Sequence, residues 1–213
     1  MVAPTLTEAN PMQLYFSPGA CSLASHIALL EAGVPFEAIK VDGRSKKAVN
    51  GEDYWQVTAK GYVPALRLDD GQVLTEGAAI LPFVADRNPG AGLAPAAGTF
   101  ERYRLHEWLG YINSEVHKGF GVFFTPGATD EAKTAGKANL AKKFVFLEQH
   151  LQGKDYLLGS AFTVADAYLF TVLGWSRIVG IDLGEWPLLK AYHARILPRP
   201  AVQAAMKAEG LVK

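Results

Sequence analysis

The sequence predicts a small α/β domain followed by a larger all-helical domain. Residues 12–86 mix short apolar or aromatic runs, which are typical of β-strands, with helical segments. Beyond residue 98 the apolar residues recur at helical spacing, and no run rivals them as a strand. Residues 87–98 are rich in Pro, Gly and Ala, as in a linker. We therefore expect domains at 12–87 and 98–213.

The first domain is expected to hold one small sheet with helices packed on it, in the order β-α-β, then a hairpin, then a helix. Asp69-Asp70-Gly71 is a typical hairpin turn between the last two strands. Pro82 costs about 3 kcal/mol inside a helix, so the last helix should start late or kink. The predicted strands are 13–16, 36–41, 65–68 and 73–75; the predicted helices are 22–32, a short turn near 52–57, and 77–86.

The second domain is expected to contain helices at 100–118, 129–151, 163–179, 186–197 and 200–207. Thr163 supplies an N-cap hydroxyl and Asp166 follows three residues later, which is close to a capping box. Phe162 precedes them and is placed to act as the hydrophobic staple. We interpret this segment as the structural anchor of a buried helix.

The helix at 100–118 carries two different faces. Its apolar face holds Leu105, Leu109, Ile112 and Val116 at about 100° per residue. A small, polar arc of about 60° holds His106, Gly110, Asn113 and His117, bordered by Ser114. A polar stripe usually faces solvent, whereas two histidines and a glycine without neighbouring charges also fit a cleft wall. Neither histidine stands four residues from another ligand, so metal binding is not expected.

Composition excludes several classes of protein. The 21 basic and 21 acidic residues cancel, so nothing indicates binding to nucleic acid or to an acidic membrane surface. A net charge near zero is compatible with oligomerisation. No apolar stretch approaches the ~18–20 residues of a membrane span. Residues 1–11 lack the apolar core of a signal peptide and precede Met12, so we interpret them as a tail or extension.

Cys21 is the only cysteine in 213 residues, and it falls where a strand gives way to a helix. Ser17-Pro18-Gly19 is turn chemistry, and helical spacing begins at Ser22. Unpaired N–H groups and the macrodipole at a helix entrance favour negative charge, which lowers a thiol pKa. The alternative is a small buried hydrophobe, as most free cysteines are. We favour a reactive thiol because the turn delivers the sulfur to the helix end.

The lone cysteine also limits its own chemistry. Position 24 is Ala24, so the chain has no Cys-x-x-Cys pair and cannot run a dithiol cycle alone. Thiol chemistry therefore needs an external thiol, and glutathione is the abundant small thiol of cells. A single cysteine also indicates a reducing compartment, and we expect a cytoplasmic protein.

Two further segments suit a small peptide ligand. Pro64 stands at a strand entrance, where spacing alone favours a trans bond because only about 5–6% of such bonds are cis. A cis bond would turn the Val63 backbone outward to pair with an extended peptide. Gly77 leaves helix N–H groups open to an anion, and Glu76 offers a partner for an ammonium group, as an amino acid zwitterion requires. Simple capping is the alternative, and it is favoured when this motif is considered alone.

Together these segments resemble bacterial beta-class glutathione S-transferases. The likeness runs from Met12 to the C-terminus, and a cysteine at position 21, where other classes have Tyr or Ser, is specific to the class. The resemblance implies a thioredoxin-like N-terminal domain, an all-helical C-terminal domain, and a homodimer with its active site between the domains. The segments that carry it are 18–26, 61–66, 75–77, 107–109, 115–120 and 162–169.

The resemblance also implies the site residues, with glutathione as co-substrate and no metal. The implied catalytic residues are Cys21, Ser22 and His117. The implied glutathione-binding residues are Cys21, Lys46, Val63, Pro64, Glu76, Gly77, Gly110, Ser114 and His117. Lys46 would meet the glycyl carboxylate, Val63 before a cis-Pro64 would pair with the cysteinyl unit, and Glu76 and Gly77 would hold the γ-glutamyl group.

One position departs from the family pattern. The family often has Asn where this chain has Gly110. The missing side chain would either enlarge the electrophile pocket or be compensated by Asn113, three residues later. Side chains expected around that pocket are Phe120, Phe123, Phe124, Trp175 and Arg177.

The expected activity joins the glutathione thiol to small hydrophobic electrophiles in detoxification, or exchanges it with disulfides through a mixed disulfide at Cys21. A more specialised alternative is a glutathione-dependent reductive dehalogenase, etherase or thiol reductase. An alternative of a different class is a non-catalytic binding or scaffold protein that has kept the fold. The presence of Cys21, Glu76 and His117 argues against this last interpretation.

Overall fold

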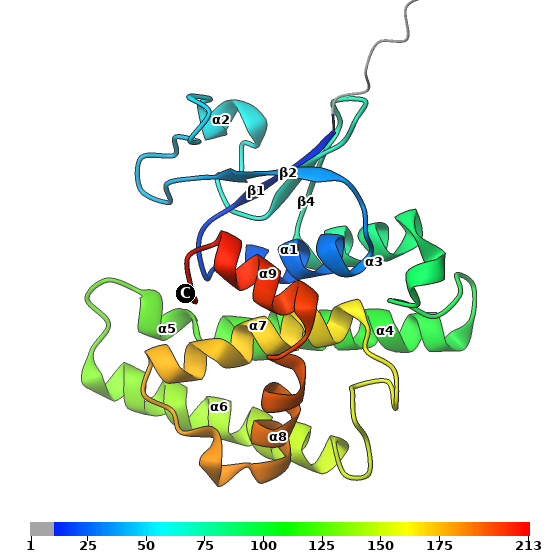
Figure 1. Cartoon of the computed structure of the whole chain (residues 1–213). Helices are drawn as coiled ribbons and strands as arrows, with labels where there is room; N and C mark the ends of the chain where they lie inside the picture. The colour runs from blue at the N-terminus through cyan, green and yellow to red at the C-terminus, as the bar shows by residue number, and fades with distance from the viewer. Residues whose placement is uncertain (1–10) are drawn as a thin grey trace, which may run out of the picture.

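Four strands form one mixed sheet at the N-terminal end of the chain (Figure 1). In this computed structural model, which describes residues 11–213, the sheet order is β2-β1-β3-β4. β1 is parallel to β2 and antiparallel to β3, and β3 is antiparallel to β4. The strands are β1 (Met12–Phe16), β2 (Phe36–Lys40), β3 (Ala65–Arg67) and β4 (Val73–Thr75). The predicted extension at 1–11 lies, up to residue 10, outside the described residues.

The two faces of this sheet are covered differently (Figure 1). α1 (Ser22–Glu31) and α3 (Gly77–Arg87) lie between the sheet and the helical half of the chain, whereas α2 (Tyr54–Val57) lies on the other side. Alternation along β1 matches this arrangement, because Leu14 and Phe16 join the large core and Tyr15 joins the small one under α2.

Pro82 does not delay α3. The helix begins at Gly77 and runs through Pro82 to Arg87, so the prediction of a late start is wrong. Pro82 lacks only the one N–H that would donate to Ala78, four residues earlier, and the helix buries Ile80, Leu81 and Val84 on either side of it. Burial of this apolar face outweighs the lost hydrogen bond.

The rest of the chain is helical. The predicted helices appear within one or two residues at most ends, while the short α5 was missed because four residues carry no periodicity. The long prediction at 100–118 divides into a regular helix and a π-helical turn, η2, a local widening that is frequent at functional sites. The elements are α4 (Phe100–Tyr111), η2 (Ile112–His117), α5 (Gly121–Phe124), α6 (Asp130–His150), α7 (Val164–Ile178), α8 (Pro187–Ile196) and α9 (Pro200–Ala208), with single 3-10 turns η1 (Pro89–Ala91) and η3 (Leu183–Glu185).

α7 is the central helix of this half, and its start is fixed as predicted by a capping box. The buried Asp166 carboxylate accepts hydrogen bonds from the Thr163 N–H and hydroxyl, each at 2.8 Å. It also accepts from the Leu157 N–H and the Tyr192 hydroxyl, each at 2.9 Å. One carboxylate therefore ties the start of α7 to the preceding loop and to α8.

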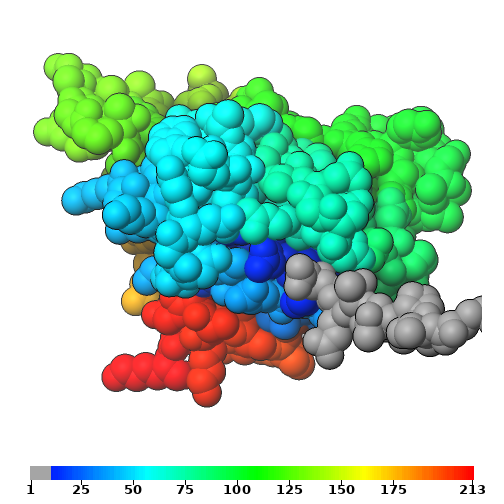
Figure 2. Space-filling model, turned by 90° about the horizontal axis from the view of Figure 1, so that it is seen from above, coloured from blue at the N-terminus to red at the C-terminus, as the bar shows by residue number. Residues whose placement is uncertain are grey.

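The two halves share one core. α1 packs against both α7 and α9, so that apolar residues of the sheet domain and of the helical domain form a single buried cluster. Seen from above, the cyan segment around α2 lies between the green helices of the middle of the chain and the red C-terminal residues (Figure 2). Within residues 11–213, no helix has the length and apolar character needed to span a bilayer.

Candidate active site

The loop between β1 and α1 places Cys21 directly before the first residue of α1. Ser22, the next residue, is fully buried, and its hydroxyl accepts from the Ser17 N–H at 3.2 Å and donates to the Ser17 carbonyl at 3.3 Å. The expectation of a second catalytic hydroxyl at Ser22 is therefore corrected, because this hydroxyl closes the loop that carries Cys21.

Gly19, in the same loop, is held through both of its backbone groups. Its N–H donates to Glu209 Oε2 at 2.9 Å, and the Trp175 indole N–H donates to its carbonyl at 2.8 Å. The second Glu209 oxygen lies 3.0 Å from His26 Nδ1 on α1, and both of these side chains are buried. Sequence reasoning missed Glu209, since no local pattern links it to residues 190 positions away.

The Cys21 thiol is protonated in the free protein. Its Sγ lies 3.4 Å from the Val63 carbonyl and donates to it. Burial raises the pKa of the Cys21 thiol to about 11, although the N–H groups of Cys21 and Ser22 and the charge of Lys118 act in the opposite direction. The prediction of a lowered thiol pKa is thus wrong for the free protein, because desolvation outweighs the favourable helix end.

The segment facing Cys21 exposes an edge of backbone. The Val63–Pro64 bond is cis, as the resemblance implied and as spacing alone did not favour. The Val63 carbonyl faces Cys21, and its N–H makes no hydrogen bond within residues 11–213. This edge is therefore open to an extended peptide.

Lys46 and Glu76 both contact the segment that precedes Val63, and each already has a partner there. Lys46 Nζ donates to the Gly61 carbonyl at 2.8 Å. Glu76, with a left-handed backbone at φ 71°, forms an exposed ion pair with Lys60 at 2.7 Å. The N–H groups of Ala79 and Ile80 both donate to the Glu76 carbonyl, so those at the very start of α3 stay open.

His117 enters the site from η2 in a defined tautomer. Its Nδ1 lies 2.7 Å from the Tyr168 hydroxyl, which itself donates to Asn113 Oδ1 at 3.0 Å. Since Tyr168 has one proton to give, His117 Nδ1–H must donate and Nε2 is left as an acceptor. Burial, followed by the charge of Lys118, lowers the pKa of His117 to about 4, so the ring is neutral at pH 7.

The polar arc predicted on this helix is only partly a cleft wall. His106, Gly110 and Ser114 are exposed, so the alternative of a solvated stripe holds for them. A Cβ at Gly110 would meet nothing within 4 Å. The Asn113 oxygen is taken by Tyr168 and so is not free to replace a side chain missing at Gly110.

Cys21 and His117 line the same cavity, of about 440 Å³, where the two halves of the chain meet. Lys118 lines it too and has no ion-pair partner within residues 11–213. The remaining lining residues are Pro18, Gly19, Ala20, Gly121, Phe124, Trp175 and Ile178. The cavity thus combines a thiol, a neutral imidazole and an ammonium group with apolar walls.

Of the side chains expected around the electrophile, Phe124 and Trp175 line this cavity, whereas Phe120 is buried in the core and Arg177 lines a neighbouring cavity. In the part of the chain that the structure describes, no three His, Cys, Asp or Glu side chains gather as a metal site would require.

Comparison with known proteins agrees with this geometry. The family models for the N-terminal and C-terminal domains of glutathione S-transferases match residues 19–87 and 111–200. The chain is 46% identical to glutathione S-transferase GstA of Escherichia coli O157:H7, over 94% of this chain and 100% of that protein. It is 36% identical to glutathione S-transferase GST-4.5 of Xanthomonas campestris pv. campestris, with the same coverage.

Solved structures give the same result. The chain is 53% identical to a bacterial transferase, BphK, solved as a ternary complex, with a TM-score of 0.91 over 93% of this chain and 99% of that one. A sphingomonad glutathione S-transferase complexed with glutathione is 51% identical, and a bacterial beta-class enzyme of Sphingomonas chungbukensis is 52% identical. Both have a TM-score of 0.91 over 94% of this chain and 100% of theirs. The predicted thioredoxin-like domain followed by a helical domain is confirmed, and the chain belongs to the glutathione S-transferase family.

Proposed function

We propose that this enzyme joins the thiol of glutathione to small apolar electrophiles and that Cys21 can hold glutathione as a mixed disulfide. The observation that carries the proposal is the shared cavity of Cys21, His117 and Lys118, beside the open backbone edge of Val63. The whole-chain likeness to named glutathione S-transferases supports the glutathione part.

Glutathione would lie along the edge of the sheet domain. Its cysteinyl unit would pair with the N–H and carbonyl of Val63, which brings the glutathione sulfur next to Cys21. The γ-glutamyl carboxylate would meet the open N–H groups at Gly77, and its ammonium would replace Lys60 at Glu76. This replacement is cheap because an exposed ion pair contributes about 0–1 kcal/mol. Lys46 would turn from the Gly61 carbonyl to the glycyl carboxylate.

Conjugation would use the groups of the cavity as follows. The glutathione thiol gives its proton to water, because His117 with a pKa of about 4 is too weak a base to hold it. The resulting thiolate attacks the electrophilic carbon while the leaving group departs with its electron pair. The Lys118 ammonium and the helix end at Cys21 stabilise the thiolate before attack. The apolar walls at Phe124 and Trp175 hold the electrophile.

Disulfide exchange would follow a balanced route at Cys21. The Cys21 thiolate attacks one sulfur of oxidised glutathione, which forms the Cys21–glutathione disulfide and releases the other half as glutathione. Pairing of the ligand with the Val63 carbonyl would free the Cys21 thiol from its present acceptor. Dehalogenation or ether cleavage, a cytoplasmic location and a role in detoxification stay predictions.

A homodimer is proposed on an apolar face of the helical domain. Phe100 and Tyr103 of α4 and Phe146 of α6 are exposed although they are large and apolar. Phe146 packs at 5.1 Å, ring centre to ring centre, against Tyr111 of α4, so the two helices meet at this face. Exposed aromatic side chains on one face are typical of a surface that pairs with another protein.

The activity itself is tested with glutathione agarose and with 1-chloro-2,4-dinitrobenzene as the electrophile. We expect the protein to be retained on the column and to form the dinitrophenyl conjugate. Gly121→Leu fills the cavity from α5, where a Cβ meets nothing within 4 Å, and should raise the KM for the aryl halide while retention on the column is kept. Passage through the column without retention, or retention without product, would instead support a non-catalytic protein.

The protonation state of Cys21 predicts how fast it reacts with iodoacetamide. With a pKa of about 11, about one thiol in 10⁴ is ionised at pH 7. The alkylation rate of the native protein, followed by mass spectrometry, should therefore rise about tenfold per pH unit from pH 7 to 9.5 without a plateau. The same protein in urea is the control: its alkylation rate should be half-maximal near pH 8.5, the ordinary pKa of a free thiol of about 8.5, and should level off above that pH. A plateau below pH 8 in the native protein would contradict the structure.

The mixed disulfide is tested by intact mass under denaturing conditions after incubation with oxidised glutathione. The native protein should gain one glutathionyl group that dithiothreitol removes. Cys21→Ala should gain none, because it has no other thiol. Lys118→Gln keeps the thiol but loses the nearby cation, so its adduct should form several-fold more slowly at pH 8. An unmodified native protein would remove this part of the proposal and leave conjugation standing.

The dimer is tested by light scattering coupled to gel filtration. The native protein should have twice the chain mass, and Phe146→Glu should move it towards the monomer because a buried, unpaired carboxylate is costly at an interface. Val49→Glu, at an exposed apolar residue of the other domain, is the control and should stay dimeric. A monomeric native protein would refute the proposal.

A further inference from the structure

The His117 ring is held by a chain of hydrogen bonds that begins outside the active-site cavity. The Tyr168 hydroxyl of α7 lies 3.0 Å from Asn113 Oδ1 and 2.7 Å from His117 Nδ1. Asn113 Oδ1 can only accept, so the Tyr168 proton points to it and the hydroxyl oxygen accepts from Nδ1–H. His117 Nε2 makes no hydrogen bond within residues 11–213. The chain therefore ends in a ring nitrogen that carries a lone pair and no proton.

Tyr168 suits the middle of this chain because its hydroxyl keeps its single proton. The side chain is buried, and its ring meets the His117 ring edge-on with centres 5.9 Å apart. Burial raises the pKa of Tyr168, and negative charge on Cys21 or Glu76 raises it further. The hydroxyl is thus un-ionised at any physiological pH, and the proton that it gives to Asn113 cannot also serve the His117 ring.

The charged and titratable groups around this chain come from three elements. Cys21 directly precedes α1, and Lys118 directly follows η2. Glu76 directly precedes α3, whose first residue, Gly77, lies against Tyr168: a Cβ at Gly77 would stand 3.9 Å from Tyr168 Cζ. Tyr168 therefore lies where the helical half of the chain meets the start of α3 and the Cys21 loop.

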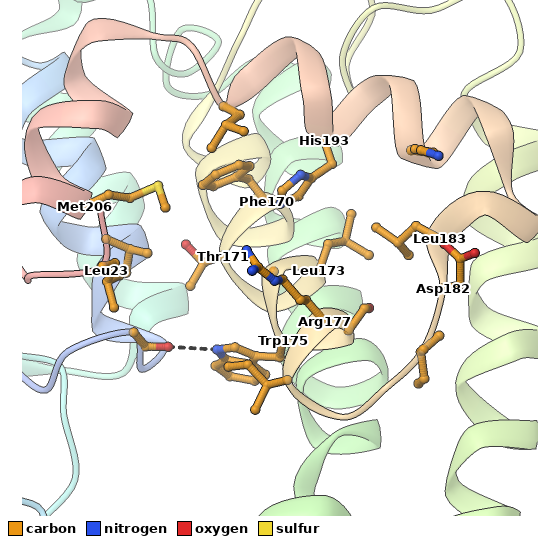
Figure 3. A pocket seen from close by; sticks show the side chains of 18 of the residues that line it. Leu23, Phe170, Thr171, Leu173, Trp175, Arg177, Asp182, Leu183, His193 and Met206 are labelled. Carbon is orange, nitrogen blue, oxygen red and sulfur yellow. Dashed lines mark hydrogen bonds between the residues drawn. The ribbon is translucent and has the colours of Figure 1, made fainter. Parts of the chain in front are cut away.

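The lone pair of His117 Nε2 has few donors to meet. His117 lines the same cavity as Cys21, and because Nδ1 is engaged outside that cavity, Nε2 is the ring nitrogen left for it. Trp175 packs edge-on against the His117 ring at 4.9 Å, but its indole N–H is taken by the Gly19 carbonyl, dashed in Figure 3. The other side-chain donors among the described lining residues are the Cys21 thiol and the Lys118 ammonium.

We propose that Asn113 and Tyr168 are positioning residues that keep His117 Nε2 free of a proton. The unprotonated nitrogen in turn favours the thiol form of Cys21 over its thiolate, because an acceptor stabilises a protonated acid and a lone pair repels an anion. The Val63 carbonyl, 3.4 Å from the Cys21 sulfur, acts in the same sense. Since the thiolate is the reactive form, the chain protects the resting cysteine from alkylation and oxidation.

Loss of either positioning residue should move one proton on the His117 ring. Without Asn113 Oδ1, the Tyr168 hydroxyl has Nδ1 as its acceptor, so the neutral ring must carry its proton on Nε2. Without the Tyr168 hydroxyl, Nδ1–H loses its buried acceptor, which again favours a proton on Nε2. In both cases an N–H group replaces the lone pair that faces the cavity, and it can donate to a thiolate at Cys21.

The position of the ring proton is read from the nitrogen-15 chemical shifts of the His117 imidazole at pH 7, with His117→Gln to identify its signals. The native ring should carry its proton on Nδ1, and the rings of Asn113→Leu and Tyr168→Phe should carry it on Nε2. Asn113→Asp is the matched control: its carboxylate still accepts from Tyr168 and cannot donate, so the native tautomer should remain.

The response of the sulfur is read from the rate at which iodoacetamide alkylates Cys21 at pH 8. Asn113→Leu and Tyr168→Phe should be alkylated about three- to tenfold faster than the native protein, as expected for the gain of one hydrogen bond to the thiolate. Asn113→Asp should be no faster than the native protein. Tyr192→Phe, which loses a buried hydroxyl bound to Asp166 at 2.9 Å, controls for general loosening of the helical domain and should keep the native rate.

Both measurements use the protein without glutathione, so their outcome does not depend on the proposed activity. Asn113 is only half-buried, so Asn113→Leu keeps the test available if Tyr168→Phe does not fold. The proposal is overturned if the native ring carries its proton on Nε2 or if the folded variants keep the native tautomer. It is also overturned if the proton moves and alkylation is no faster than in Tyr192→Phe.

Discussion

A buried carboxylate near the end of the chain holds the reactive end of α1 in place. Glu209 joins the His26 ring to the Gly19 N–H, and Trp175 takes the carbonyl of the same glycine. Loss of either partner would leave buried polar groups unpaired, at about 1–3 kcal/mol for each. The conformation of the Cys21 loop thus depends on residues of the helical domain as much as on the sheet from which the loop starts. The two halves of the chain cannot be understood as independent units at this site.

Burial sets the resting chemistry of that site. The same low-polarity surroundings raise the pKa of Cys21 to about 11 and lower that of His117 to about 4, so both groups are neutral near pH 7. Lys118 is then the one permanent charge among the described residues that line the cavity. The thiolate of bound glutathione would meet the Lys118 ammonium and the open N–H groups at the start of α1. Because Cys21 is neutral, no second negative charge would compete for them. Neutrality of the resting cysteine therefore suits glutathione as the nucleophile in conjugation.

Patterns of residues close in sequence predicted the strands and helices well. They did not predict the properties of side chains that depend on burial. Helical spacing and turn residues gave the order of strands and helices, and the Thr163–Asp166 spacing gave the capping box, because each depends on residues close in sequence. The Cys21 pKa and the roles of Ser22 and Lys118 depend on the residues that pack around these side chains. The sequence at a helix entrance does not reveal those residues. Likewise, helical periodicity placed Asn113 and His117 on one arc but could not reveal Tyr168, 51 residues from His117, between them.

Trp175 connects these observations. Its indole N–H fixes Gly19, its ring packs edge-on against His117 at 4.9 Å and against Phe124 at 5.6 Å, and its side chain separates the two cavities. A rigid aromatic side chain with a single donor suits this position, because it orders a loop and an imidazole while it presents apolar surface on both sides. A ligand in the active-site cavity would pack against this ring, so it would share one wall with the loop of Cys21 and the His117 ring. Through that wall, binding of a ligand would affect the position of the Cys21 sulfur.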